Sequence, residues 1–476
     1  MNRRSAEKIF NSGKEPTISK LLEMDKSLRK LQCQVDCLSK NSTNSSKPPS
    51  SDIVKPRHHN QTATTTDTAK RKIGGQPGHP LHRRPLFHKS EITSFIDYHL
   101  ECCPNCSGQL QLRPDQDRIL QQVELNENPL KKNQHKAYAY WCEHCKKIHY
   151  ADFPPPVIKA GLFKEDISAT VCFLKFVGAM SLSGIKKYCR DILNITVTKG
   201  YLAKIIRKGM LAIRPAYDEL LKKLPDQQFL NIDETGHKEN GELFWTWIFR
   251  APDFAAFVID KSRGSQVLIE VLGKEFKGVL GCDYFSAYRK YMKDFNIILQ
   301  FCLAHLIRDV KYLCDRKDKT VAAHGIKLLD TIKELFKTIH ERDSMNSTSF
   351  STELDACSKI IIAVATIDIP DDKDCKNMAN RFLKHGNAYF QFITTPGIDP
   401  TNNIAEQALR FVVMYRHVSQ GTRSEKGRKA CECFWSVVAT CVIQGRSAFS
   451  FIKDAFLAFF NGNEPPSLLP TSLSSP

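Results

Sequence analysis

The chain has 476 residues, 42% of them hydrophobic, so it is too long for one ordinary domain and apolar enough to bury real cores. Its 69 lysines and arginines exceed its 51 aspartates and glutamates, giving a net charge of +18. Positive charge spread along the whole chain favours a polyanionic partner, most commonly nucleic acid, with a generic basic protein as the alternative.

The N-terminus lacks the apolar core of a signal peptide, and no run of about 18 uncharged apolar residues is present. We therefore expect a cytoplasmic protein with no membrane partner. In that compartment its 17 cysteines are expected to be thiols or metal ligands rather than disulfides.

Apolar residues recur at heptad spacing near the N-terminus, in two series offset by three positions: Leu21, Leu28, Val35 and Met24, Leu31, Leu38. This pattern predicts a coiled coil within residues 1–40 that pairs chains into a homodimer or higher oligomer. An amphipathic helix that packs on its own chain is the alternative. Residues 41–90 are rich in Ser, Asn, Pro and basic residues, which predicts a flexible basic linker.

Two C-x-x-C motifs lie in residues 91–155, and they contain Cys103, Cys106, Cys142 and Cys145. Two such motifs can close a tetrahedral site around one structural Zn²⁺, at sulfur–metal distances of about 2.3 Å. The segment between them suits a small zinc-binding β module. Cys102 is an alternative to Cys103, and His144 and His149 are further candidate ligands; unliganded cysteines in a β module are the alternative to a metal site.

Residues 156–225 have helical periodicity. A helix that starts with a serine cap, a short turn, and a second helix with several basic residues resemble a helix-turn-helix DNA-binding unit. An ordinary helical hairpin fits the same pattern. The candidate DNA-binding residues of the second helix are Lys199, Lys204, Arg207 and Lys208.

Past Pro225 the periodicity changes to that of strands. Residues 226–300 predict three meandering strands, a helix and a fourth strand, which is the opening of an α/β ribonuclease-H-like fold. The first strand is expected to end at Asp233, before a turn, and the fourth to end at Asp283. If the fourth strand lies parallel beside the first, the two aspartates meet at neighbouring strand ends. Alternation along the strand is expected to point Glu234 elsewhere.

Clustered carboxylates suit phosphodiester chemistry, because two Mg²⁺ ions held by acids can neutralise charge at the attacking and leaving oxygens. Each aspartate also has a simpler explanation, a turn residue for Asp233 and a helix cap for Asp283. Glu406 has one too: with Asn403 as N-cap it would be the third residue of a capping box.

Several segments together resemble bacterial insertion-sequence transposases of the TnpC type, the IS sixty-six group. They are the N-terminal zipper, "KNSTNSSKPPSSD", "GGQPGH", the paired C-x-x-C motifs, "NIDET", "CDYFSAY", "CLAH" and "NNIAEQALR". In "CLAH", which contains Cys302 and His305, Leu303 stands where the family has a tryptophan. Gln407 replaces a common arginine, and Tyr284-Phe285 replaces a Gly-Tyr pair.

The resemblance implies a DDE transposase in which Asp233, Asp283 and Glu406 are the catalytic acids. It also implies two Mg²⁺ or Mn²⁺ ions as cofactors. Residues 301–395 are then a helical insertion and residues 396–460 the last part of the catalytic core, followed by a disordered tail at 461–476. The candidate phosphate contacts behind the third acid are Arg410, Arg416, Arg423 and Arg428, unless these form only a solvated basic face.

The expected reaction is binding of the element's terminal repeats, strand cleavage to free a 3′-OH, and transfer of that end to target DNA, with small accessory proteins as further partners. Bound to DNA, the protein is expected at the nucleoid. Two alternatives remain: an inactive or domesticated DNA-binding derivative, and a ribonuclease-H-like nuclease that cuts without strand transfer.

Overall fold

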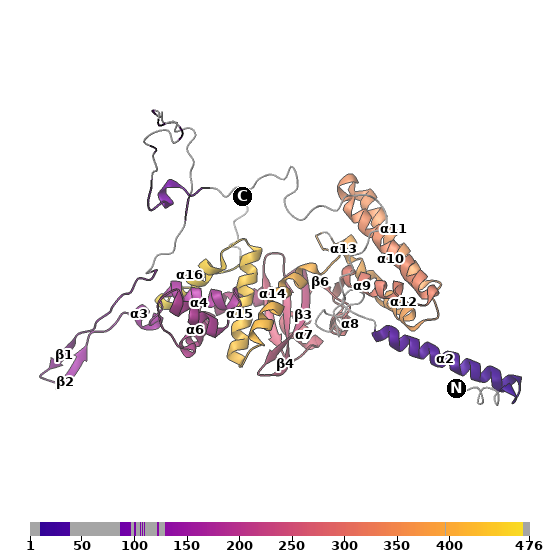
Figure 1. Cartoon of the computed structure of the whole chain (residues 1–476), viewed down its shortest axis with the longest axis horizontal. Helices are drawn as coiled ribbons and strands as arrows, with labels where there is room; N and C mark the ends of the chain where they lie inside the picture. The colour runs from indigo at the N-terminus through magenta and orange to yellow at the C-terminus, as the bar shows by residue number, and fades with distance from the viewer. Residues whose placement is uncertain are drawn as a thin grey trace. The chain divides into compact units, whose positions relative to one another are not determined.

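The computed structural model describes residues 10–38, 86–96, 129–395 and 397–469, with single positions between 100 and 122. The chain divides into two units, one of residues 57–134 and one of residues 1–56 and 135–476 (Figure 1). In the described part of the smaller unit, the 3₁₀ helix η2 (Lys89–Glu91) is closed by a capping box from His88. Within the described residues, no helix is long and apolar enough to cross a membrane.

The N-terminal helix that the heptads predict is present as α2 (Lys14–Leu38). Three seam residues are exposed: Leu21 by 59%, Met24 by 37% and Leu28 by 62%. The predicted pairing of chains through this seam is not tested by a single chain and stays a prediction. Most of the predicted linker 41–90 lies outside the described residues.

A five-stranded mixed sheet forms the centre of the larger unit. Its strands are β3 (Phe229–Glu239), β4 (Glu242–Arg250), β5 (Ala255–Asp260), β6 (Val279–Cys282) and β7 (Ile298–Phe301), in the order β5-β4-β3-β6-β7. The first three strands form an antiparallel meander, while β6 lies parallel to β3 and β7 parallel to β6. Helices α7 (Ser265–Leu272) and α8 (Ser286–Phe295) connect β5 to β6 and β6 to β7. The predicted order of strands and helix, and the parallel pairing of first and fourth strands, are confirmed.

The first strand is longer than expected, because β3 continues six residues beyond Asp233 to Glu239. Asn240 and Gly241 both have positive φ and form the two-residue hairpin turn that leads into β4. Such turns match the twist of antiparallel strands, and the pairing of β3 with β4 runs without interruption from this turn back to Asn231. The expectation of a turn directly after Asp233 is therefore wrong.

The edge of the sheet formed by β5 is covered by the helix α15 (Glu425–Ile443). Backbone N–H groups of Ala255, Phe257 and Ile259 on β5 donate hydrogen bonds to side chains of that helix. The acceptors are Thr440 Oγ1 at 3.1 Å, Ser436 Oγ at 2.8 Å and Glu432 Oε1 at 2.8 Å. The three acceptors are four residues apart and therefore share one face of the helix. The three donors are alternate residues of β5, whose N–H groups point to the same side of the strand, so each donor on this edge lies opposite one acceptor.

The helices of residues 156–225 share a core with the C-terminal helices. They are α3 (Pro155–Ala160), α4 (Glu165–Phe176), α5 (Leu182–Asp191) and α6 (Lys199–Lys223). Helices α3, α4 and α6 pack with α15 or α16 (Ala448–Asn461), and α5 packs on α4 and α6 (Figure 1). Phe176 stacks on Phe434 with ring centroids 4.2 Å apart. Ser181 and Thr198 cap α5 and α6, so the predicted serine cap is confirmed.

The expectation of disorder from residue 461 is wrong for the residues up to Leu469. Leu468 is 1% exposed, and its carbonyl accepts a hydrogen bond from Gln444. Ser467 also donates a hydrogen bond to Glu219 of α6 at 2.6 Å. The chain up to Leu469 thus packs on the helices, and the rest lies outside the described residues.

The segment between Asp283 and Glu406 is mostly helical, as the sequence predicts. After β7 it contains α9 (Leu303–Cys314), α10 (Lys319–His340), η4 (Arg342–Ser344), α11 (Ser347–Thr366), α12 (Lys373–His385), η5 (Gly386–Tyr389) and α13 (Gln391–Thr394). Arg316 at the end of α9 pairs with Asp372 at 3.0 Å and Asp374 at 2.6 Å, which ties α9 to the start of α12.

Replacing Ser436 by alanine tests the edge cover. Ser436→Ala leaves the buried N–H of Phe257 without its acceptor, which is expected to cost about 1–3 kcal/mol of unfolding free energy. Urea unfolding followed by the fluorescence of the buried Trp247 and Trp435 measures this loss. Ser450→Ala, at an exposed position of α16, is the control and should change little. Equal stability of the two variants would contradict the proposed role of the edge bonds.

Candidate functional site

The two predicted aspartates lie at the place where the parallel pairing of the sheet ends. β3 pairs with β6 only over Phe229–Asn231, and Asp233 lies two residues further along β3. Asp283 directly follows the last residue of β6. Each carboxylate accepts one local backbone hydrogen bond on Oδ1, from Glu234 at 2.9 Å and from Phe285 at 2.9 Å respectively. The second oxygen of each is left for another ligand.

Glu406 lies in the first turn of α14 (Asn403–Ser419), but it does not cap that helix. The N-cap is Asn402, which makes no side-chain capping bond, so Glu406 is the fourth helical residue. The capping box with Asn403 as N-cap is therefore wrong. The Glu406 carboxylate instead accepts a hydrogen bond from Arg308 of α9 at 3.1 Å.

Asn402 is buried and joins α14 to the sheet. Its Oδ1 accepts a hydrogen bond from Asn231 at 2.7 Å, and its Nδ2 donates to the carbonyl of Ile232 at 2.8 Å. Its backbone N–H donates to Cys302 Sγ at 3.1 Å. These three bonds position the helix that carries Glu406 beside the strand that carries Asp233.

The three acids influence one another electrostatically. Burial raises the pKa of Asp233 well above its usual value, and the charges of Glu234, Asp283 and Glu406 raise it further. Burial also raises the pKa of Asp283, to about 7, with a further contribution from Glu234. Their oxygens do not form a group within 4.8 Å of one another, as two other sets of side chains in the described part of the chain do. The charges of both other acids thus act on Asp233, although the three carboxylates are not close enough to form one such group.

Glu234 is a fourth acid beside this set. Its side chain is 1% exposed. Its charge is the largest one that raises the pKa of both Asp233 and Asp283, so Glu234 lies close to the set and the expectation that it points elsewhere is not confirmed. Tyr288 of α8 donates a hydrogen bond to it at 2.5 Å, and Arg263 pairs with it at 2.8 Å. Arg263 in turn lies over the rings of Trp245 and Phe285, 4.3 and 4.2 Å from their centroids. The Arg263 charge lowers the pKa of Asp283, so it partly offsets the repulsion among the acids.

The eight basic residues predicted to bind DNA fall into two sets. Lys208 donates to the carbonyls of Lys159 and Ala160, Arg416 to Thr235 and Gly236, and Arg428 to Glu239 and Ile259. These three side chains hold parts of the fold together, and their predicted contact with DNA stays a prediction. The other five are exposed: Lys199, Lys204, Arg207, Arg410 and Arg423.

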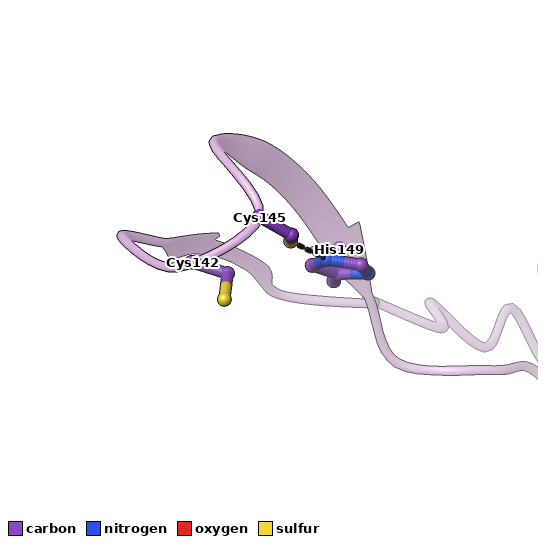
Figure 2. A group of neighbouring side chains, drawn as sticks. All are labelled: Cys142, Cys145 and His149. Atoms are coloured by element: carbon purple, nitrogen blue, oxygen red, sulfur yellow. Dashed lines mark hydrogen bonds between the residues drawn. The ribbon is translucent and has the colours of Figure 1, made fainter.

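The second C-x-x-C motif lies in a β hairpin of β1 (Ala139–Cys142) and β2 (Lys147–Tyr150). Figure 2 shows Cys145 and His149 directed toward each other, with Cys142 nearby, and Cys145 Sγ lies 3.0 Å from His149 Nε2. Ligand atoms of all three residues lie within 4.8 Å of one another. Hydrogen bonding with Cys145 lowers the pKa of the Cys142 thiol. Cys103 and Cys106 lie outside the described residues, so the four-cysteine site stays a prediction.

Sequence reasoning did not identify the roles of Asn402, Arg308 or Glu234. A signal existed for Arg308, because it lies three residues after His305 in a helical segment and therefore on the same face. For Asn402 and Glu234 the decisive partners come from elements 29 to 171 residues away, which no local pattern reveals.

Comparison with known families gives two matches. Residues 160–430 match the family described as "Transposase IS66 family", and residues 8–85 match a family of unknown function (DUF6444). No curated protein matches the chain. The first match covers more than half of the 476 residues, including the sheet, the helical insertion and all three acids. The chain therefore belongs to the IS66 family of transposases.

Proposed function

We propose that this transposase cleaves and transfers DNA strands with Asp233, Asp283 and Glu406 as its catalytic acids. The observation that carries the proposal is the placement of Asp233 and Asp283 where the parallel pairing of β3 and β6 ends, with α14 fixed beside β3 through Asn402. Burial and the charges of Glu234, Asp283 and Glu406 also raise the pKa of Asp233. Buried acids that repel one another favour the binding of cations, and such groups are typical of functional sites. The sheet order and the two aspartates at neighbouring strands also support a ribonuclease-H-like core.

The donor set fits a hard divalent ion. All three side chains offer carboxylate oxygens, the ligands that Mg²⁺ and Mn²⁺ prefer. A bound pair of such ions would supply charge neutralisation at the attacking and leaving oxygens of a phosphodiester. The protein's own contribution is to hold the acids on β3, β6 and α14, with Asn402 and Arg308 orienting the third.

DNA binding is proposed for the five exposed basic residues Lys199, Lys204, Arg207, Arg410 and Arg423. Contacts of this kind position the phosphate backbone and do not read sequence. The proposed substrates are double-stranded element ends and target DNA.

Charge removal at each acid is the main test. Glu406→Gln, Asp233→Asn and Asp283→Asn should each lower cleavage of labelled terminal-repeat DNA by roughly 100-fold or more, because the lost charge acts where the transition state needs it. DNA binding should persist, and the double aspartate variant should be hardly worse than either single one. Glu425→Gln, at an exposed first-turn acid of α15, is the matched control.

Arg410→Ala gives the opposite pattern in the same assay. Arg410 is on the same helix as Glu406 but is exposed, so its loss should weaken DNA binding. The dependence of the DNA-binding constant on salt concentration should fall by the amount expected for about one lost phosphate contact. For the charge-removal test, a wild-type cleavage rate in Glu406→Gln would show that Glu406 is not a catalytic acid.

The raised pKa of Asp283 predicts a pH effect in the absence of divalent ions. Burial raises that pKa to about 7, above the value of about 3.9 in an unfolded chain. The folded state then binds more protons between these values, so the contribution of Asp283 to stability falls as pH rises from about 4 to about 7. The unfolding free energy of Asp283→Asn relative to that of wild type should therefore increase as the pH rises, by up to about 4 kcal/mol. Unfolding in EDTA at pH 5 and pH 8 checks this, and a pH-independent difference would exclude it.

We also propose that Cys142 and Cys145 are ligands of a structural zinc ion, as the paired C-x-x-C motifs predict. Metal analysis should detect bound Zn²⁺, and Cys142→Ser should lower the zinc content by about one ion per chain. His149→Gln tests the additional ligand suggested by the hairpin, and Cys357→Ser, on α11, is the control. A folded wild-type protein without zinc would rule out this site.

The exposed seam of α2 is proposed to pair two chains. Deletion of residues 1–40 eliminates the exposed Leu21, Met24 and Leu28. It should abolish self-association in sedimentation experiments and leave the zinc content unchanged. An unchanged oligomer would locate the pairing surface elsewhere.

A further inference from the structure

A second set of metal-ligand side chains meets at the start of α9. Atoms of Cys302, His305 and Glu406 all lie within 4.8 Å of one another. A thiol, an imidazole and one carboxylate do not suit Mg²⁺, which prefers oxygen alone. They are the ligand types of Zn²⁺ and similar ions. The proposed catalytic function uses only Glu406 of the three.

Local structure explains why Cys302 and His305 face the same point. Cys302 is the N-cap of α9 and His305 is its third residue, so both lie on one face of the first turn. Cys302 is 2% exposed, and its Sγ is oriented by the backbone N–H of Asn402. That bond also brings in the first turn of α14, from which Glu406 projects.

His305 has a nitrogen available for a ligand. Its Nδ1 is buried, has no hydrogen-bond partner in the described part of the protein, and lies 3.5 Å from Glu406 Oε1. A buried ring nitrogen without a partner is costly, and a bound ion would satisfy it.

We propose that Cys302, His305 and Glu406 bind one zinc-like divalent ion, with the fourth position open to water. Tetrahedral ligands at about 2.0–2.3 Å from zinc lie about 3.3–3.8 Å from one another, and the 3.5 Å between His305 Nδ1 and Glu406 Oε1 already falls in this range. Side-chain rotation of His305 and Glu406 suffices for the remaining adjustment, since Glu406 is 26% exposed.

Arg308 is the cation that now pairs with the shared carboxylate. Its Nη2 lies 3.1 Å from Glu406 Oε1 and 3.3 Å from His305 Nε2, so it competes with an ion for Glu406 and leaves His305 Nδ1 without a partner. The Arg308 side chain is 26% exposed and can move toward solvent. Binding of the ion therefore displaces Arg308, and removal of Arg308 favours the ion.

The consequence is regulatory and rests on the proposed function. An ion held by Cys302 and His305 draws Glu406 away from Asp233 and Asp283, so zinc inhibits Mg²⁺-dependent cleavage. The proposed site thus discriminates between two kinds of metal through one shared carboxylate.

Cobalt substitution tests the site without any need for activity. The probe is Co²⁺ added to the full chain carrying Cys142→Ser and Cys145→Ser, which removes both thiols of the hairpin. A thiolate-to-cobalt charge-transfer band is expected, and it should disappear with Cys302→Ser and persist with Cys314→Ser, at the other end of α9. Arg308→Gln should bind Co²⁺ roughly tenfold more tightly, because a charge-assisted contact no longer competes.

Two further measurements complete the test. His305→Gln should weaken cobalt binding even if Cys302→Ser fails to fold. Zinc should lower the cleavage rate of wild type by a larger factor than that of Cys302→Ser, each relative to its own zinc-free rate. A cobalt band insensitive to Cys302→Ser and His305→Gln, or unchanged affinity in Arg308→Gln, overturns the proposal. A protein that shows the band but never cleaves DNA would instead contradict only the proposed function.

Discussion

The site depends on the buried side chain of Asn402. Asn231 and Asn402 are separated by 171 residues, yet their amides bond directly, and Asn402 also donates to the backbone of β3. The side-chain amide offers a donor and an acceptor at once, and both bind β3, while the backbone N–H of the same residue donates to the Cys302 thiol. A smaller or apolar residue there would leave buried groups unsatisfied, and the third acid would lose its fixed place beside the first two.

Electrostatic repulsion among the acids is tolerated because the surroundings supply fixed positive partners. Arg263 pairs with Glu234 between two aromatic rings, and Arg308 pairs with Glu406. Planar guanidinium groups suit both tasks, since they stack on rings and donate to carboxylates at the same time. The positive partners thus come from two sides, a loop next to the sheet and the first helix of the insertion.

Much of the central fold could be predicted from the sequence because its signals are local. Alternating apolar residues and turn residues identified β3, β4, β5 and β6, and helical periodicity identified most of the insertion. The length of β3 was missed because Asp233 and Glu234 are poor strand formers, whereas the Asn240-Gly241 turn that sets the end of the strand lies further on. The surroundings of Glu406 were missed for a different reason: Asn403 and Glu406 have capping-box spacing, but Asn402 begins the helix and Arg308, 98 residues earlier, is the partner of Glu406. The roles of the acids themselves were predicted only through the family resemblance.

The cover on β5 has a consequence for how the chain is made. The hydrogen bonds that close this edge join residues 173 to 185 positions apart. A growing polypeptide completes β5 long before it reaches Glu432, so during synthesis the strand presents unpaired N–H groups on an open border of the sheet. Such borders can recruit other strands, and non-local closure is slow. A nascent chain of this protein is therefore most exposed to misassembly during the interval in which its insertion is being translated, and molecules truncated before α15 retain that hazard permanently.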